Sequence, residues 1–147
     1  MEKLEGLIPP LITPFDKKGN PDLKALENIV EFIKDYIHGV FLCGTYGQGP
    51  IMSFEEKKIV IKKVVSMLNS SKKIVVHVGC ANPYQAYELA KYAEDLGVDV
   101  IASVPPFYYR YSEESVIHYF KELVSRVDIP VYVYNNPPRV GYPVTLN

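Results

Sequence analysis

The sequence predicts an α/β fold in which parallel strands alternate with helices. Short apolar runs rich in β-branched residues recur about every 30 residues along the chain. Segments in which apolar residues have helical spacing lie between these runs. Because strands that alternate with helices are joined by right-handed crossovers, we expect the strands to lie parallel in one sheet.

The expected strands are residues 6–15, 39–43, 74–78, 98–104 and 129–134. Prolines break the first of these, so we expect it to leave the sheet irregularly. The expected helices are residues 21–37, 53–69, 82–96 and 112–127. Pro21 suits a first helical turn, where a missing N–H costs nothing. Ser53 and Glu56 have the spacing of a capping box, which predicts the start of the second helix.

Composition places these elements in one domain, residues 1–147. With 48% hydrophobic residues, the 147-residue chain can bury an ordinary core. The 16 basic and 17 acidic side chains nearly balance, and no basic run pairs with exposed aromatics, so we expect no nucleic-acid partner. No apolar run reaches the ~18 to 20 residues of a membrane span, and the N-terminus lacks a signal-peptide pattern, so we expect a cytoplasmic protein without membrane contact.

The cysteines and histidines give no metal-binding pattern. Cys43 and Cys80 are too far apart for a CxxC motif and are expected to be reduced, buried thiols. His38, His77 and His118 share no ligand spacing. His77 interrupts an apolar strand, which favours a hydrogen-bonded histidine in the interior. We therefore expect no metal site.

A glycine-rich loop follows the second expected strand and is the most informative motif of the chain. Residues 44–49 read Gly-Thr-Tyr-Gly-Gln-Gly. Glycines allow the backbone to approach a ligand closely, and Thr45 adds a hydroxyl beside the N–H groups. The loop is a candidate site for a carboxylate or phosphate, and a plain tight turn between strand and helix is the alternative.

Further polar side chains follow the other strands, at the edge where sites form in parallel folds. A phenol in a hydrogen-bonded chain can relay protons to a carbonyl substrate, which makes Tyr134 and Tyr108 candidates. Arg139 is a candidate clamp for a carboxylate. Periodicity leaves two architectures open, a complete doubly wound sheet of five strands and an incomplete (β/α)8 barrel.

These motifs together resemble one enzyme family, the dihydrodipicolinate synthase and N-acetylneuraminate lyase family of pyruvate-dependent class I aldolases. The similar segments, in order, are Ile12-Thr13-Pro14-Phe15, residues 44–50, Pro106-Phe107-Tyr108 and Tyr134-Asn135-x-Pro137-x-Arg139-x-Gly141. The resemblance spans essentially the whole chain. It implies a (β/α)8 TIM barrel, of which residues 1–147 would be the N-terminal part, about the first five β/α units, cut after strand five.

The resemblance also implies roles for the site residues. Gly44, Thr45 and Tyr46 would bind the carboxylate of pyruvate or another 2-keto acid, and Thr45 would share a proton relay with Tyr134. Tyr134 would be the acid/base group beside the imine. Adjacent subunits would exchange the Tyr108 phenol, so that each subunit places it in the site of its neighbour. This implies a homo-oligomer, a dimer or a tetramer.

A second substrate, an aldehyde, is implied in the same way. Arg139 would bind its carboxylate, as in the synthase branch. Tyr46 stands where the family usually has a second threonine, and Gln48-Gly49-Pro50 is more similar to the 2-keto-3-deoxy sugar acid aldolases, so their reaction is an alternative.

The family forms a Schiff base with a lysine on a later strand. All 13 lysines of this chain are expected as solvated surface charges, so that lysine would lie beyond the chain.

Two other functions stay open. The chain alone would act as a noncatalytic half-barrel that binds keto acids or supports assembly, or as a flavodoxin-like nucleotide domain, although it lacks the usual phosphate motifs. No cofactor is implied, because the lysine imine is itself the electron sink of class I aldol chemistry. An unclosed sheet exposes apolar surface, which predicts self-association or a partner that carries the remaining strands.

Overall fold

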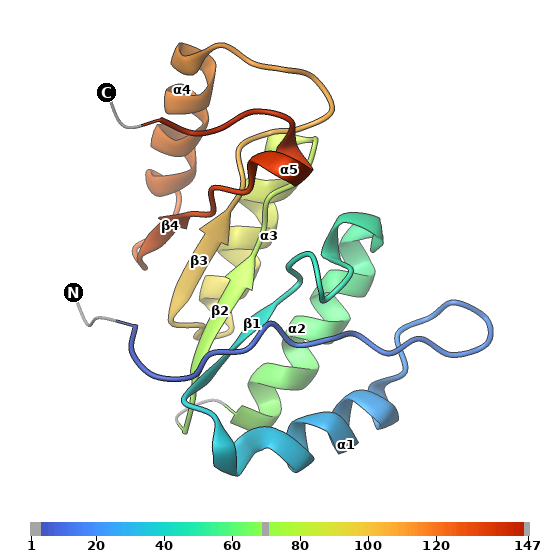
Figure 1. Cartoon of the computed structure of the whole chain (residues 1–147). Helices are drawn as coiled ribbons and strands as arrows, with labels where there is room; N and C mark the ends of the chain where they lie inside the picture. Colours follow the sequence, from blue (N-terminus) through green and yellow to red (C-terminus); the bar gives the residue numbers. More distant parts are fainter. Residues whose placement is uncertain (1–3, 69–70, 146–147) are drawn as a thin grey trace.

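The computed structural model describes residues 4–68 and 71–145. In that part of the chain, four strands form one parallel sheet in the order β1-β2-β3-β4. The strands are β1 (Gly39–Leu42), β2 (Lys73–His77), β3 (Val100–Ser103) and β4 (Val131–Val133). The predicted α/β class with parallel strands is confirmed, and strands that follow one another in the sequence are neighbours in the sheet (Figure 1).

Four longer helices accompany the strands and pack side by side in chain order. They are α1 (Leu23–Ile33), α2 (Phe54–Leu68), α3 (Pro83–Asp95) and α4 (Glu113–Val124). Right-handed crossovers between successive neighbouring strands all place their helices on the same face, whereas a doubly wound sheet carries helices on both faces. The strand order therefore selects the barrel type of winding from the two architectures that periodicity left open.

Local signals in the sequence set the starts of the first two helices. The Asp22 carboxylate accepts hydrogen bonds from two N–H groups of the first turn, so α1 begins at Leu23 and not at Pro21 as expected. The predicted capping box is confirmed. The Ser53 N–H donates to the Glu56 carboxylate at 2.7 Å, and the Glu56 N–H donates to Ser53 Oγ at 3.3 Å.

Residues 6–15 form no named strand, which corrects the expectation of a fifth one. Pro10 makes only an isolated parallel bridge with Phe41. The Leu11 N–H donates to Phe41 O, and the Phe41 N–H donates to Pro9 O, both at 2.9 Å. Pro9 and Pro10 have no N–H, so the pairing cannot extend into a regular ladder. The segment still runs along β1, where the first strand was expected (Figure 1).

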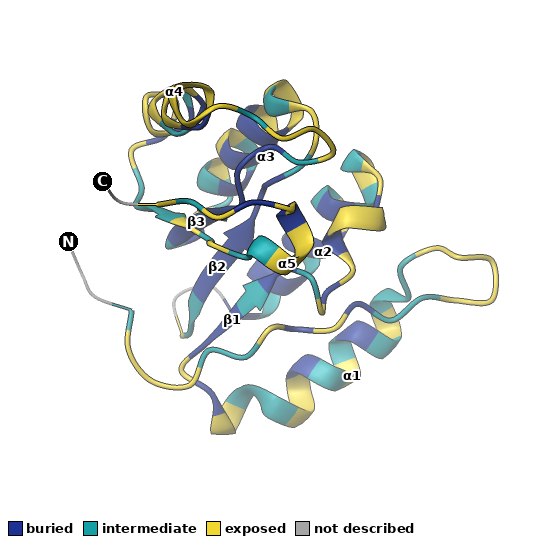
Figure 2. Ribbon diagram, turned by 45° about the horizontal axis from the view of Figure 1, so that its top comes forward, coloured by how far each residue is buried: buried dark blue, intermediate teal, exposed yellow. Residues whose placement is uncertain are grey.

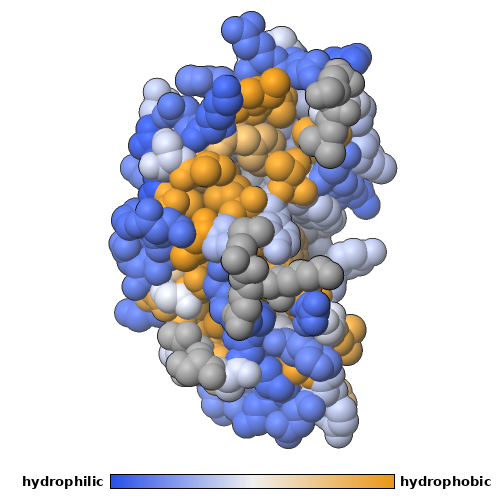
Figure 3. Space-filling view, turned by 90° about the vertical axis from the view of Figure 1, so that its left-hand side faces the viewer, coloured by the Kyte–Doolittle hydropathy of each residue, from blue (hydrophilic) through white to orange (hydrophobic). Residues whose placement is uncertain are grey.

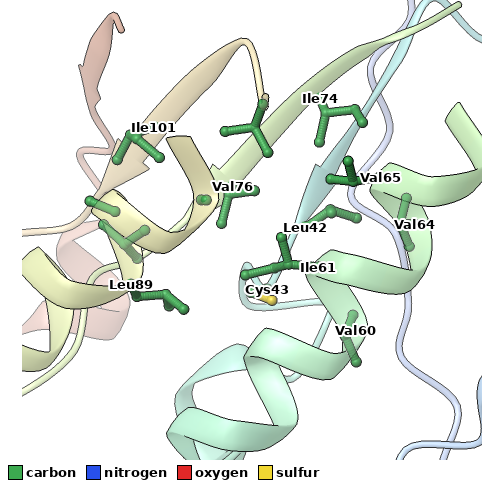
Figure 4. Close-up of a cluster of buried hydrophobic side chains, with 14 of the residues drawn as sticks. Leu42, Cys43, Val60, Ile61, Val64, Val65, Ile74, Val76, Leu89 and Ile101 are labelled. Carbon is green, nitrogen blue, oxygen red and sulfur yellow. The ribbon is translucent and has the colours of Figure 1, made fainter. Parts of the chain in front are cut away.

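The main core lies between the sheet and the helices. Figure 4 shows Ile74, Val76 and Ile101 of the sheet near Ile61 of α2 and Leu89 of α3, all of them buried. Full burial of one such side chain contributes about 1.5–3 kcal/mol. This packing fixes the strands that present the loops at their carboxyl ends.

The second face of the sheet, opposite the helices, carries a smaller apolar cluster. Its buried members are Val75, Val100 and Ala102, against which Leu4, Ile8, Phe41 and Tyr132 pack. In Figure 2 the strands β2 and β3 are largely buried, whereas much of α4 and the loop before it are exposed. Figure 3 shows a band of hydrophobic side chains on one side of the molecule.

One lysine departs from the sequence prediction. Lys57 on α2 is only 7% exposed, so the expectation that every lysine is solvated is wrong at this position. Lys57 precedes Val60 and Ile61 by three and four residues, which places it on the helix face that packs toward the sheet. Burial raises the pKa of Cys43 and lowers the pKa of His77, and the Lys57 charge opposes the first shift and adds to the second.

Candidate active site at the carboxyl ends of the strands

The glycine-rich loop leaves β1 through a left-handed turn. Cys43 has a φ of 56°, although it is not a glycine. A Cβ on Gly44 would lie 2.4 Å from the Phe41 ring, and one on Gly49 would lie 1.7 Å from the Cys43 oxygen. Because no side chain fits at these two positions, close packing against the end of β1 sets the path of the loop.

The loop presents hydrogen-bond donors that no described group uses. Among residues 4–68 and 71–145, nothing accepts a hydrogen bond from the N–H groups of Thr45, Tyr46 and Gly47. A hydrogen bond anchors the loop to the segment before β1, because the buried Thr13 hydroxyl donates to Gly47 O at 2.8 Å. The Thr45 hydroxyl and the N–H groups of Thr45 and Tyr46, which line the hollows described next, can bind a carboxylate, whereas Gly47 is buried and lines neither hollow.

Thr45 lines two hollows at this end of the sheet. The first, of about 410 Å³, lies over the second face of the sheet and is also lined by Tyr46 and Tyr134. The second, of about 380 Å³, is also lined by Gln48, His77, Asn136 and Arg139. Thr45 is therefore the predicted site residue that belongs to both hollows.

Tyr134 directly follows β4 and is half-buried. Its phenol oxygen accepts a hydrogen bond from Asn136 Nδ2 at 3.1 Å, which leaves the phenol O–H to donate elsewhere. Its ring meets Phe41 and His77 edge-on, with centroids 5.6 and 5.7 Å apart. Across the described residues, no hydrogen bond joins Tyr134 to Thr45, so the two side chains share a hollow without direct contact.

Arg139 lies on the short helix α5 (Pro137–Val140), an element that the sequence analysis did not predict. Its side chain is exposed, and none of the described residues that line the second hollow is an aspartate or glutamate. The hollow therefore carries a positive charge without a carboxylate in its wall, which favours an anionic ligand.

Two predicted site residues stand apart from the hollows. Tyr108 is 84% exposed, has a φ of 88° and packs edge-on against Tyr109 at 5.0 Å. It lines neither hollow, so this chain does not bring it to Thr45 and Tyr134. Gly44 is buried beneath the loop and contributes backbone geometry rather than a contact surface.

His77 is the interior, hydrogen-bonded group that the sequence predicts. It is 4% exposed, and its Nδ1 lies 3.1 Å from Cys43 O. Burial lowers the pKa of His77 to about 4, and burial also raises the pKa of the Cys43 thiol to about 12. Sequence reasoning missed that His77 and Asn136 line the second hollow. A polar residue at the end of an apolar strand was the available signal for His77.

Among residues 4–68 and 71–145, no lysine lines either hollow. In the described part of the chain, no three side chains of the metal-ligating kinds come together. The helices described there include none that is long and apolar enough to cross a membrane.

Residues 3–147 match the model of the Dihydrodipicolinate synthetase family. The chain belongs to this family. Family members are class I pyruvate aldolases built on a (β/α)8 barrel, which agrees with the winding of the sheet.

Relatives in this family include a synthase and a lyase. The chain is 36% identical over 141 residues to the 4-hydroxy-tetrahydrodipicolinate synthase of Methanopyrus kandleri, covering 95% of the chain and 47% of that protein. It is 32% identical over 149 residues to the N-acetylneuraminate lyase of Mediterraneibacter gnavus, and this match covers 100% of the chain and 47% of that lyase. The chain thus spans about half the length of these relatives.

A solved family structure matches the fold. YagE, a prophage protein of the dihydrodipicolinic acid synthase family from E. coli K12, was crystallised in complex with pyruvate. It superimposes with a TM-score of 0.91 at 28% identity, over 95% of this chain and 47% of YagE. The predicted fold family and the predicted match to the N-terminal portion of its members are confirmed.

Proposed function

We propose that this chain supplies the keto-acid-binding and aldehyde-binding part of the active site of a pyruvate-dependent aldolase or synthase. The observation that carries the proposal is the loop at residues 45–47, where the N–H groups of Thr45 and Tyr46 have no acceptor within the described chain and adjoin the Thr45 hydroxyl. The loop adjoins the hollow that holds Tyr134 and the hollow that holds Arg139. The pyruvate complex of the related YagE supports a 2-keto acid as the ligand.

The chemistry assigns a role to each side chain. A lysine amine beyond this chain condenses with the keto carbon of pyruvate, releasing water and forming an imine. Loss of a methyl proton gives an enamine, whose carbon attacks the aldehyde carbonyl while the carbonyl oxygen takes up a proton. Tyr134, oriented by Asn136, exchanges these protons, and Thr45 with the loop N–H groups holds the pyruvate carboxylate.

Arg139 would hold an anionic group of the aldehyde substrate. The Gln48 and Asn136 amides that line the same hollow would suit a hydroxylated aldehyde, which keeps a 2-keto-3-deoxy sugar acid aldolase as the alternative reaction. Tyr108, with its exposed ring, would reach the site of an adjacent subunit in a homo-oligomer. The reaction needs no organic cofactor, since the imine is the electron sink.

Calorimetric titration with pyruvate tests the proposal. We expect the chain to bind pyruvate, and Thr45→Val to weaken binding about tenfold, as loss of one hydrogen bond to a charged group implies. Thr145→Val is the matched control, because Thr145 lines a different hollow and should leave the affinity unchanged. Equal affinity of the chain and Thr45→Val would remove Thr45 from the carboxylate site.

A second candidate function is a noncatalytic half-barrel that binds keto acids. It is favoured by one observation, that no lysine of the described residues lies in the walls of the two hollows. Reduction with borohydride in the presence of pyruvate, followed by intact-mass measurement, distinguishes it from a self-sufficient aldolase. A pyruvate adduct on the chain would exclude the noncatalytic function.

A further inference from the structure

His77 connects the carboxyl ends of three strands. It is the last residue of β2, and its Nδ1 lies 3.1 Å from Cys43 O at the end of β1. Its Nε2 accepts a hydrogen bond from the Val104 N–H, at the end of β3, at 3.4 Å. A carbonyl only accepts and a backbone N–H only donates, so Nδ1 must carry the proton and Nε2 must be bare. The two contacts together specify one neutral tautomer.

The contact with Cys43 bears on the glycine-rich loop. Cys43 adopts the left-handed conformation, which is strained for a residue with a side chain. The Cys43 oxygen is enclosed by the loop, since a Cβ on Gly49 would lie 1.7 Å from it. In the described chain, His77 provides the hydrogen bond to this oxygen that no backbone N–H supplies. Without that donor, the turn would leave a buried carbonyl unsatisfied.

The same ring also contacts the other side of the site. The His77 and Tyr134 rings meet edge-on at 5.7 Å, with an interplanar angle of 89°. Gly79 provides the room for this arrangement, because a Cβ there would lie 3.0 Å from His77 Nε2 and 2.9 Å from Val104 N. The position of the imidazole is therefore fixed on several sides.

We propose that His77 is a positioning residue of the keto-acid site. The Nδ1-protonated imidazole of His77 holds the left-handed turn at Cys43. This turn sets the position of the N–H groups of residues 45–47 relative to the Tyr134 ring. The function of those groups rests on the proposed function above. The positioning itself does not, since it concerns the ligand-free chain.

Two measurements test this role. Long-range ¹H–¹⁵N NMR of the ligand-free chain should show His77 as the Nδ1-protonated tautomer. An Nε2-protonated or charged ring at neutral pH would overturn the proposal. His77→Leu removes the donor and should shift the amide signals of residues 45–47 in the ligand-free spectrum, whereas His77→Asn keeps an N–H donor near the Nδ1 position and should largely restore them.

Pyruvate affinity gives the functional readout. We expect His77→Leu to bind pyruvate at least about tenfold more weakly and His77→Asn to recover most of the loss. His118→Asn, on the exposed side of α4, is the matched control and should bind like the parent chain. Unchanged amide signals in a folded His77→Leu variant would overturn the proposal. If the parent chain binds no pyruvate, the proposed function fails, while the tautomer and the ligand-free spectra still decide the role of His77.

Discussion

At the scale of single residues, we expect the burial of His77 to make the fold sensitive to acid. Burial lowers the pKa of His77 to about 4, below the value of 6.5 for an unperturbed histidine. Between these values the unfolded chain binds a proton that the folded chain does not, so stability falls as the pH falls from about 6.5 to about 4. A difference of this size corresponds to about 3 kcal/mol.

Urea unfolding at several pH values checks this expectation. The free energy of unfolding should decrease from pH 7 to about pH 5, a range above that in which the carboxylates titrate. His77→Asn should remove most of that decrease, and His118→Asn should keep it. An equal decrease in the parent chain and in His77→Asn would show that His77 does not cause the acid sensitivity.

The site residues differ in how far the sequence predicts them. Thr45, Tyr134 and Arg139 could be placed at one edge because each follows an apolar run, and parallel strands end on the same side. The burial of Lys57 was missed, because its charge suggested solvent although its helical position faced the sheet. The contact between His77 and Val104 depends on the register of β2 against β3, which a single sequence does not reveal.

At the scale of elements, the glycine-rich loop depends on Gly49. An added Cβ would lie 1.7 Å from a backbone oxygen, so the backbone would have to shift. We expect Gly49→Ala to lower the free energy of unfolding by roughly 2–3 kcal/mol, as overpacking does. Gly19→Ala is the control, because Gly19 has a φ of +86° but open space around it, and strain alone should cost about 1 kcal/mol. If chemical denaturation showed that Gly49→Ala loses less unfolding free energy than Gly19→Ala, close packing at Gly49 would not be what sets the path of the loop.

The misjudged segments of this chain contain proline, whereas the capped start of α2 was predicted correctly. The capping box at Ser53 and Glu56 is a local signal, and the structure contains it as expected. The segment 6–15 looked like a strand by its apolar content, but its prolines limit pairing to an isolated bridge. The helix α5 was missed because Pro137 and Pro138 suggest a turn, although proline is well accommodated in a first helical turn.

At the scale of the whole molecule, the edge of the sheet predicts association. β4 is the last strand of the sheet, and Val133 on it is exposed. An exposed edge strand and the hydrophobic band of Figure 3 favour pairing with another chain. We expect the chain to elute above its monomer mass of 16.7 kDa in size-exclusion chromatography with light scattering.

A charge on the edge strand should reduce that association. Val133→Lys places a lysine where β4 would pair, and lysines on edge strands oppose such pairing. Ile59→Lys, at an exposed position on α2, is the control and should leave the mass distribution unchanged. A parent chain that is monomeric at every concentration would exclude association through this edge.

Binding of a 2-keto acid carboxylate by residues 45–47 can be measured directly by an amide NMR titration of the ¹⁵N-labelled chain with pyruvate. We expect saturable shifts of the Thr45, Tyr46 and Gly47 amide signals, with smaller shifts around Tyr134. Shifts confined to another region, or none at concentrations that saturate other keto-acid sites, would contradict it.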